Sequence, residues 1–427
     1  MKASINTALP KCVCASERVK LIGSLDGLFP AFGHHQEREM GGLWLHPVKL
    51  LDGFWMKLRD LKADNVDTWM IADGFENRPE GNSFHYGSGL GHTRLSIERR
   101  QLAPEGAAGL VVRWLIHNHA AEPGQARLRF LARSGFQPVW FSDTVGLHKG
   151  GQDQGCWDEA AGVAILRDQV HPWFAAVAAS MKPVAVTLAD LPCPQTVSQD
   201  GLSLQLDFDL LLPPGETALD IFIAGSFSSE ADCLAQLALL RVRDWAEEKE
   251  ARYQALLSQC RLSGTAPDFC EVFDWVKVNT DWLIQDAGPY GRGLTAGLPE
   301  YPWWFGCDNC YALQGVLALG DYRLCRDTLA LLLRYSRQHN GNGRILHEVT
   351  TGGVCANPGN TQETAHFLLI VHLYYQYSGD LAFLKEAYDY LALSVHWIEA
   401  QDTDGDLFPS GYGIIEIAGL KSEMIDS

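Results

Sequence analysis

The stretch from Pro299 to Gly315 reads PEYPWWFGCDNCYALQG, and the rest of the chain is organised around it. Five aromatic side chains surround the carboxylate of Asp308, at the entry to a segment that is typical of an apolar helix. Adjacent tryptophans are costly to expose and suit a slot that stacks on flat ligand faces. An acid among them is poorly solvated, which favours its protonated form and suits a general acid. The stretch also fits a buried core in which Asp308 is only a helix N-cap, and by itself it leaves both interpretations open.

Helices dominate the part of the chain that carries this stretch, residues 263–427. Pro267 opens a helix whose apolar face includes Phe269, Val272 and Val276. The pattern predicts further helices over about 309–319, 322–339, 360–379 and 381–399. Asn360 and Glu363 have the spacing of a capping box, so Glu363 is a capping residue or a site residue.

The connections between these helices alternate in length. Long polar and aromatic loops at 287–306, 344–359 and 402–421 alternate with tight turns at 320–321 and 379–380. A toroid of helical hairpins has this asymmetry, and we expect the functional site where the long loops gather. His347 and Glu348 follow a Gly-rich turn in the second loop, and Glu416 lies on a Gly-rich segment of the third. Each is a candidate ligand-binding residue, although His347 and Glu348 also fit a structural ion pair.

The first part of the chain, residues 1–227, reads as β structure. Leu202–Leu210 alternates strictly between apolar and polar residues, and shorter alternations occur at 94–98, 112–116 and 126–130. Strands at hairpin spacing without intervening helices predict an antiparallel β-sandwich, here of large curved sheets. Residues 228–262 then read as one long linker helix that begins at Glu230, with Ser228 or Ser229 as its cap.

The amino-acid composition restricts the classes of protein to which this chain can belong. With 427 residues, 47% of them hydrophobic and 20% charged, the chain has ample core for a globular protein of several domains. The net charge of −18 argues against nucleic acid or an anionic membrane as partner and fits a neutral substrate. No apolar run of membrane-spanning length and no signal-peptide pattern occurs. Eleven cysteines without framework spacing favour reduced thiols and a cytoplasmic location.

The sequence predicts no metal site and no cofactor. Cys307 and Cys310 form a C-x-x-C pair but lack the context of a redox or zinc motif. The histidines at 34, 35, 85 and 92 are not at metal-binding spacing. The segment Asp402–Asp406 resembles a calcium loop, yet an EF-hand would need Gly and Glu where Leu407 and Gly413 stand. We expect a turn there, and the sequence leaves calcium binding open.

Several motifs together carry a resemblance to a known family. The chain resembles bacterial glycogen-debranching (amylo-α-1,6-glucosidase-like) proteins, which are (α/α)6-barrel glycoside hydrolases. The segment 301–308, YPWWFGCD, is similar to the family's P-W-F-G-x-D, and 343–348, GRILHE, is similar to its G-x-I-P-H-E. The segments 357–364 and 402–406 are also similar. The resemblance covers roughly 90–427 and implies a supersandwich-like β-sandwich, a linker helix and an (α/α)6 toroid.

The resemblance also implies a chemistry. Asp308 would be the general acid that protonates the glycosidic oxygen, and in an inverting scheme a second carboxylate would activate water from the opposite face. That base lies late in the family's barrel, and the sequence predicts about five barrel helices where the resemblance implies twelve. We therefore expect a C-terminally truncated fragment, inactive and poorly soluble alone, with its base beyond Ser427. Asn309, Cys310 and Leu346 depart from the family pattern, which weakens the substrate assignment more than the reaction class.

The expected function is thus a glycoside hydrolase acting on an α-glucan or a related oligosaccharide. The candidate residues for contacting this substrate are Trp303, Trp304, Phe305, Asn309, Tyr311, His347, Glu348, Glu363 and Glu416. A glycoside phosphorylase of the same architecture and a non-catalytic sugar-binding protein remain open. A polysaccharide lyase is disfavoured, because in that class the toroid comes first.

Overall fold

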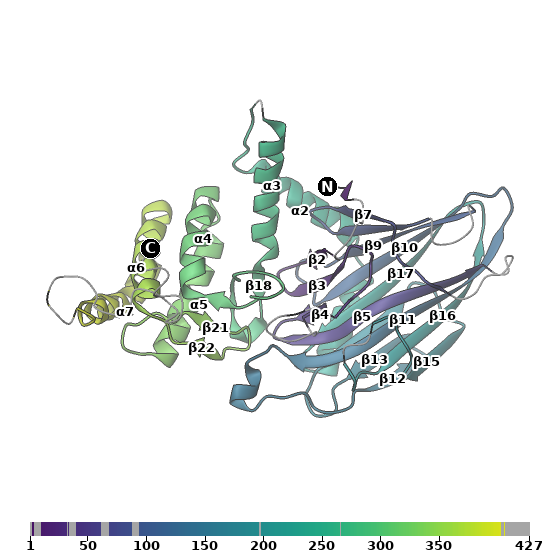
Figure 1. Cartoon of the computed structure of the whole chain (residues 1–427), viewed down its shortest axis with the longest axis horizontal. Helices are drawn as coiled ribbons and strands as arrows, with labels where there is room; N and C mark the ends of the chain where they lie inside the picture. Colours follow the sequence, from purple (N-terminus) through teal and green to yellow (C-terminus); the bar gives the residue numbers. More distant parts are fainter. Residues whose placement is uncertain are drawn as a thin grey trace. The chain divides into compact units, whose positions relative to one another are not determined.

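The computed structural model describes residues 2–3, 10–31, 33, 40–60, 68–87, 94–195, 198–264, 266–402 and 405 (Figure 1). The described residues fall into two compact units. The first, here the β unit, is drawn from Met1–Trp140, Gly146–Ser258 and Glu271–Val278. The second, here the helical unit, is drawn from Phe141–Val145, Gln259–Cys270 and Asn279–Ser427.

Within its described residues, the β unit contains two large antiparallel sheets. The strands of the nine-stranded sheet follow one another in space as β1 (Lys2–Ala3), β7 (Gly74–Asn77), β8 (Asn82–Tyr86), β9 (Leu95–Leu102), β10 (Gly109–Asn118), β17 (Gly215–Ser226), β14 (Phe174–Ala179), β13 (Val163–Arg167) and β12 (Gln154–Asp158). Those of the eight-stranded sheet are β15 (Ala185–Ala189), β16 (Ser203–Leu212), β11 (Gly124–Pro138), β5 (Val48–Asp60), β4 (Gly42–Leu45), β3 (Val19–Ser24) and β2 (Lys11–Ala15), with β6 (Thr68–Trp69) paired to β5.

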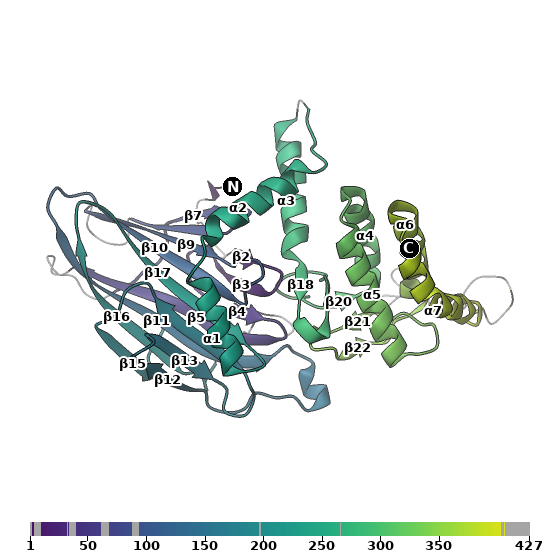
Figure 2. The same ribbon diagram turned by 180° about the vertical axis from the view of Figure 1, so that it is seen from behind.

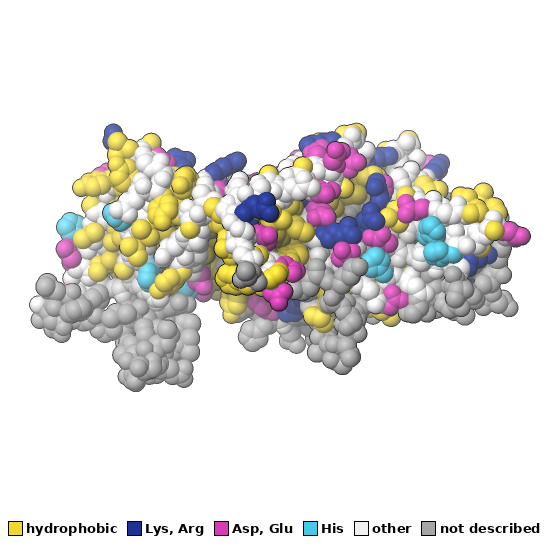
Figure 3. Space-filling view, turned by 90° about the horizontal axis from the view of Figure 1, so that it is seen from above, with side chains coloured by type: hydrophobic (Ala, Val, Ile, Leu, Met, Phe, Trp, Pro, Cys, Tyr) yellow, Lys and Arg dark blue, Asp and Glu magenta, His cyan; other side chains and the backbone are white. Residues whose placement is uncertain are grey.

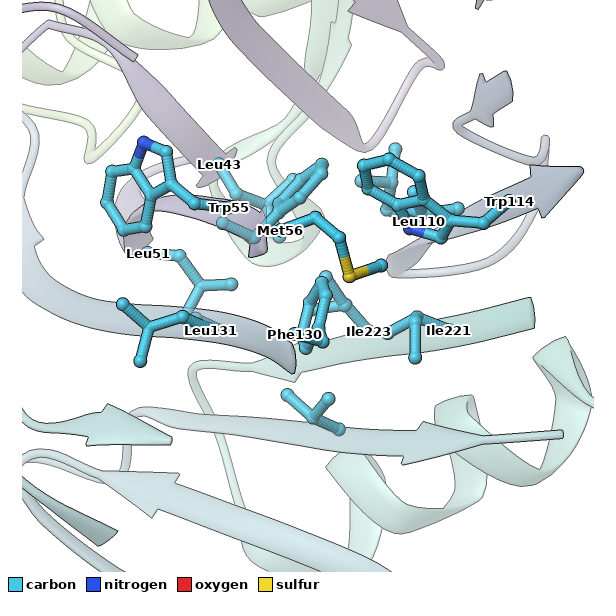
Figure 4. Close-up of a cluster of buried hydrophobic side chains, with 14 of the residues drawn as sticks. Leu43, Leu51, Trp55, Met56, Leu110, Trp114, Phe130, Leu131, Ile221 and Ile223 are labelled. Carbon is cyan, nitrogen blue, oxygen red and sulfur yellow. The ribbon is translucent and has the colours of Figure 1, made fainter. Parts of the chain in front are cut away.

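One hydrophobic core joins the two sheets of the β unit. The apolar members of each alternating strand are buried, including Val112 and Trp114 on β10 and Leu128 and Phe130 on β11. Figure 4 shows Phe130 in a cluster with Trp114, which comes from the other sheet. The predicted antiparallel β structure of the first part is therefore confirmed, because its alternation matches a sheet with one buried face.

The segment predicted as one linker helix is two helices, so that prediction is wrong. Ser229 caps α1 (Glu230–Leu240) as expected, accepting a hydrogen bond from the backbone N–H of Asp232. The helix then ends, and α2 (Trp245–Ser258) begins after a short turn. The indole of Trp245 donates to the carbonyl of Leu240 at 3.0 Å. Trp245 is buried with the apolar side of α1 against β13, β14 and β17, and this anchor favours the break between the helices.

The remaining helices match the sequence pattern closely. They are α3 (Pro267–Trp282), α4 (Gly306–Leu319), α5 (Tyr322–His339), α6 (Thr361–Ser378) and α7 (Leu381–Glu399). Two of the predicted tight turns begin at Gly320 and Gly379, which both adopt the left-handed conformation that glycine tolerates at a helix end. Between the helices lie the 3-10 turns η2 (Ser142–Val145) and η3 (Gly288–Tyr290), and the short strands β18 (Ile284–Asp286), β19 (Arg292–Leu294), β20 (Trp304–Phe305), β21 (Glu348–Val349) and β22 (Cys355–Asn357).

Apolar side chains are exposed on several of these helices. On α3, the side chains of Phe269, Val272 and Val276 lie on the surface, so its predicted apolar face is not buried in this structure. Exposed apolar residues also occur along α6 and α7, among them Leu369 and Tyr388. Figure 3 shows hydrophobic side chains gathered over the helices of the helical unit.

Some sequence-based predictions concern residues outside the described set. Glu416, most of the predicted loop at 402–421, and the histidines at 34, 35 and 92 lie outside the described residues. Of the Asp402–Asp406 segment, Asp402 and Gly405 are described, and the Asp402 carboxylate accepts from the Gly405 N–H at 2.8 Å. Across the residues that the structure describes, no helix combines the length and the apolar character needed to cross a membrane.

Candidate active site

The loop before α4 and the loop after α5 form one small antiparallel sheet, β20–β21–β22. In its register, Phe305 lies opposite Glu348, and Trp304 lies opposite Val349. The N–H of Gly306 donates to the carbonyl of His347 at 2.7 Å. The sheet therefore brings the two motif segments together, the aromatic stretch before Asp308 and the His347–Glu348 pair.

Two helices begin beside this sheet. Asp308 is the third residue of α4, and Glu363 is the third residue of α6. The two helices pack against one another, and Figures 1 and 2 show them side by side. The predicted capping box is confirmed: the Glu363 carboxylate accepts from the Asn360 N–H at 2.6 Å, and the Asn360 side chain pairs with the N–H of Glu363.

His347 connects two carboxylates at this place. Its Nδ1 lies 3.0 Å from Oε1 of Glu363, and its Nε2 lies 3.5 Å from Oε1 of Glu348. The side chains of His347 and Glu363 are buried, with 1% and 0% of their surface exposed, whereas that of Glu348 is 27% exposed. The ring of Phe305 packs edge-on against the imidazole at 5.3 Å. Glu363 therefore has two roles, capping α6 and fixing the His347 ring, and only Glu348 of the three reaches the surface.

The two glutamates have opposite electrostatic surroundings. Burial raises the pKa of Glu348, and His347 opposes this while the negative charge of Asp308 adds to it. Burial would also raise the pKa of Glu363, but the close contact with His347 and hydrogen bonds from backbone N–H groups outweigh it and hold that pKa below its ordinary value. Glu363 is thus a fixed negative charge, while Glu348 is the carboxyl group whose surroundings favour a proton.

Asp308 lies in a different environment from the one predicted. Its side chain is exposed, so the expectation of a poorly solvated acid among aromatic rings is not met in this structure. The alternative of an N-cap is also wrong, because the N-cap of α4 is Phe305 and Asp308 stands in the first helical turn. At that position the helix dipole favours a negative charge.

The aromatic residues before Asp308 are largely buried. Trp303, Trp304 and Phe305 expose 7%, 0% and 5% of their surface, respectively. The Trp304 ring stacks on that of Tyr335 at 6.5 Å, within the core of the helical unit. With no exposed surface, Trp304 supports the site from the core and offers no face to a ligand in this conformation.

The side chains of Asn309 and Tyr311 lie in different surroundings. The Asn309 amide is buried and donates to the carbonyl of Leu294 at 2.7 Å, which ties α4 to β19. Tyr311 is 52% exposed, and its hydroxyl lies 2.8 Å from Nε2 of His366 on α6. Sequence reasoning missed His366. The signal was present, because His366 follows Glu363 by one helical turn and so lies on the same side of α6.

The C-x-x-C pair lies in the interior of the helical unit. Cys307 and Cys310 are both buried, and burial raises the pKa of the Cys310 thiol well above its ordinary value. A buried thiol of high pKa is a poor redox nucleophile. In the described ranges, no group of three or more His, Cys, Asp or Glu side chains is arranged to hold a metal ion.

We expect Glu363→Gln to lower the free energy of unfolding of the helical unit by about 2 kcal/mol at neutral pH. The amide can still accept from the Asn360 N–H but removes the charge beside His347. Because the folded-state pKa of Glu363 is lowered, its contribution is present above the unfolded value and is lost as the pH falls through the folded value. Urea unfolding at neutral and acidic pH measures this. Asp321→Asn, at the exposed cap of α5, should change little at either pH, and an equal effect of both variants would contradict the role of Glu363.

Comparison with known proteins finds similarity in structure and not in sequence. No protein-family model matches the sequence, and no curated protein matches it. The fold is similar to that of a protein from the human microbiome provisionally described as a kojibiose phosphorylase, with a TM-score of 0.59 and 7% identity over 87% of this chain. It is also similar to a bacterial glucoamylase in complex with acarbose, with a TM-score of 0.56 and 10% identity over 93% of this chain.

These similarities define a class of fold. At such low identities they concern architecture alone, β sheets followed by helices. The chain spans 54% of the length of the first of these proteins and 60% of the second.

Proposed function

We propose that this chain belongs to a carbohydrate-active enzyme that breaks glycosidic bonds in an α-glucan or a related neutral oligosaccharide. In this proposal the β unit is a supersandwich-like domain and the helical unit is part of an (α/α)6 toroid, as in the glycogen-debranching proteins that the motifs resemble. The fold shared with a glucoamylase and with a protein described as a phosphorylase supports the class of reaction. The net charge of −18 supports a neutral substrate, and the free cysteines are compatible with a cytoplasmic location.

The pairing of β20 with β21 is the observation that carries the proposal. Through it, Glu348 and His347 lie beside the start of α4, where Asp308 is exposed, and beside the start of α6. Glycosidic bond cleavage requires a carboxylic acid that protonates the leaving oxygen. Asp308 and Glu348 supply two carboxyl groups at one place, and the negative charge of Asp308 helps to raise the pKa of Glu348. A pair of interacting carboxyl groups is the arrangement from which such an acid is drawn.

The proposed role of Asp308 follows from the resemblance of its motif to that of the debranching proteins, and the other roles follow from exposure. Asp308 is the general acid, and Glu348 binds a sugar hydroxyl beside it. Tyr311 offers an exposed ring for a sugar face. The site is supported from the interior by four buried residues, Trp303, Trp304, Phe305 and Asn309. Glu363 and His347 orient Glu348. Glu416 stays a candidate ligand, and an inverting reaction would use a further carboxylate, for which we propose no residue of this chain.

A glycoside phosphorylase is the second candidate, since one of the similar structures is described as a phosphorylase. The two reactions differ in the attacking group, which is water in a hydrolase and phosphate in a phosphorylase. We expect the native polypeptide that carries this sequence to release free sugar from α-linked gluco-oligosaccharides, measured with and without inorganic phosphate. Sugar 1-phosphate formed only when phosphate is present would select the phosphorylase. Neither product from any oligosaccharide tested would overturn the proposed enzyme.

A further inference from the structure

An open cavity of about 680 Å³ lies in the helical unit, away from the candidate active site. Its walls come from β19, α5 and α7, and Figure 2 shows α5 and α7 in the helical unit. Three arginines line it, Arg292, Arg334 and Arg337, together with the acidic residues Asp327 and Glu386. Neither Asp308, His347 nor Glu348 lines this cavity. Three guanidinium groups around one cavity are unexpected in a chain of net charge −18.

One of these arginines is already neutralised. A guanidinium nitrogen of Arg292 lies 2.6 Å from a carboxylate oxygen of Asp327. The same Asp327 carboxylate is also approached by the exposed Arg323 at 3.8 Å. The Arg292 charge is therefore balanced within the protein, and the charges that could bind a ligand are those of Arg334 and Arg337.

Arg334 and Arg337 are held in place without a carboxylate. Arg334 donates to the carbonyl of Tyr290 and lies over the ring of Tyr335 at 4.6 Å. Arg337 donates to the backbone carbonyl of Glu386 at 2.6 Å and lies over the ring of Tyr390 at 5.8 Å. In the described part of the chain, neither guanidinium forms an ion pair. Carbonyls and aromatic faces fix each group while leaving its charge and its other N–H donors available.

The two groups have the arrangement of an anion site. Positions 334 and 337 are one helical turn apart on α5, so both face the same cavity. Planar guanidinium groups bind phosphate through paired hydrogen bonds, and fixing them beforehand reduces the entropy lost on binding. The side-chain amide of Gln338 adds hydrogen-bond donors and an acceptor, and Ala330 and Leu331 provide an apolar wall. The volume accommodates a ligand of the size of a hexose phosphate.

We propose that this cavity binds a phosphoryl group, as free phosphate or as a sugar phosphate ester, through Arg334 and Arg337. This second site is independent of the proposed cleavage chemistry, because it shares no residue with the candidate active site. Phosphate at this place would act as an effector of the protein, since neither Asp308 nor Glu348, the carboxyl groups proposed for the active site, lines the cavity.

The test is calorimetric titration of the native polypeptide with inorganic phosphate and, separately, with glucose 6-phosphate, at constant ionic strength. We expect binding of at least one probe below about 10 mM, and a loss in affinity of about tenfold or more in Arg334→Gln and in Arg337→Gln. Arg334→Lys and Arg337→Lys keep the positive charge and serve as controls for misfolding. They should also weaken binding, because lysine cannot form the paired hydrogen bonds of a guanidinium group. Lys385→Ala removes an exposed charge near the cavity and should change nothing.

The outcomes separate the possible ligands. Equal affinities for the two probes identify the phosphoryl group itself as the ligand, and tighter binding of glucose 6-phosphate identifies an ester. The proposal is overturned if neither probe binds, or if all four arginine variants bind like wild type. It is also overturned if Glu348→Gln abolishes phosphate binding while the arginine variants retain it, since the phosphate would then occupy the candidate active site.

Discussion

Asp308→Asn is expected to lower kcat for glycosidic bond cleavage by about 10³-fold in the native polypeptide, because the amide cannot donate the proton that the leaving oxygen needs. The KM should change far less, since the side chain keeps its size and its hydrogen-bonding reach. The fold should survive, because Asp308 is exposed and caps no helix. Initial rates on an α-linked gluco-oligosaccharide, with circular dichroism on the same samples, measure both quantities.

The comparison with Glu348→Gln makes this experiment specific. Both residues carry carboxyl groups at one place, and the surroundings of Glu348 are those that favour a proton. If Asp308→Asn retains the wild-type rate and Glu348→Gln loses it, the acid is Glu348 and the role proposed for Asp308 is wrong. Asp321→Asn, an exposed carboxylate at the cap of α5, is the matched control and should leave the rate unchanged.

Gly306→Ala is expected to destabilise the helical unit by about 3 kcal/mol or more. A Cβ atom at residue 306 would lie 2.1 Å from the carbonyl oxygen of Leu346 and 3.2 Å from Cγ of Glu363. The first of these is a backbone atom of the loop that pairs with β20, so it cannot rotate away as a side chain could. The methyl group would therefore push apart the two motif segments that form the candidate site.

Gly315→Ala on the same helix is the matched control for Gly306→Ala. Among the described residues, nothing lies within 4 Å of a Cβ atom at residue 315, so alanine should stabilise α4 by about 0.5 to 1 kcal/mol. Urea unfolding followed by far-ultraviolet circular dichroism measures both variants. Equal stability of Gly306→Ala and wild type would show that the close approach of α4 to the Leu346 carbonyl does not exist in solution.

The sequence predicted most helix boundaries of the helical unit because the signals are local. The limits of α5 and α7 agree with the predicted ranges, and the Asn360–Glu363 capping box is present. Caps and glycine ends depend on side chains and backbone angles within a few residues, which the sequence displays directly. The alternating strands of the β unit were predictable for a similar reason, since alternation follows from one buried face.

The details of the candidate site were harder to predict from the sequence. The positions of Asp308, Glu348 and Glu363 near one another depend on β20 pairing with β21, which joins residues about forty positions apart. The break between α1 and α2 depends on Trp245 packing against strands of the nine-stranded sheet. The sequence predicted that the long loops gather at one site. It did not predict the pairing of β20 with β21 or the break between the helices, because contacts between distant segments leave no periodic signal in the sequence.

For the aromatic stretch around Asp308, the sequence by itself indicated a helix that begins near the acid, after a run of aromatic side chains. Only the tertiary structure decided which groups meet water. Trp303, Trp304 and Phe305 are buried, whereas Tyr301, Tyr311 and the Asp308 carboxylate are exposed. Solvation depends on every segment packed around a side chain, whereas secondary structure depends chiefly on its neighbours in the chain.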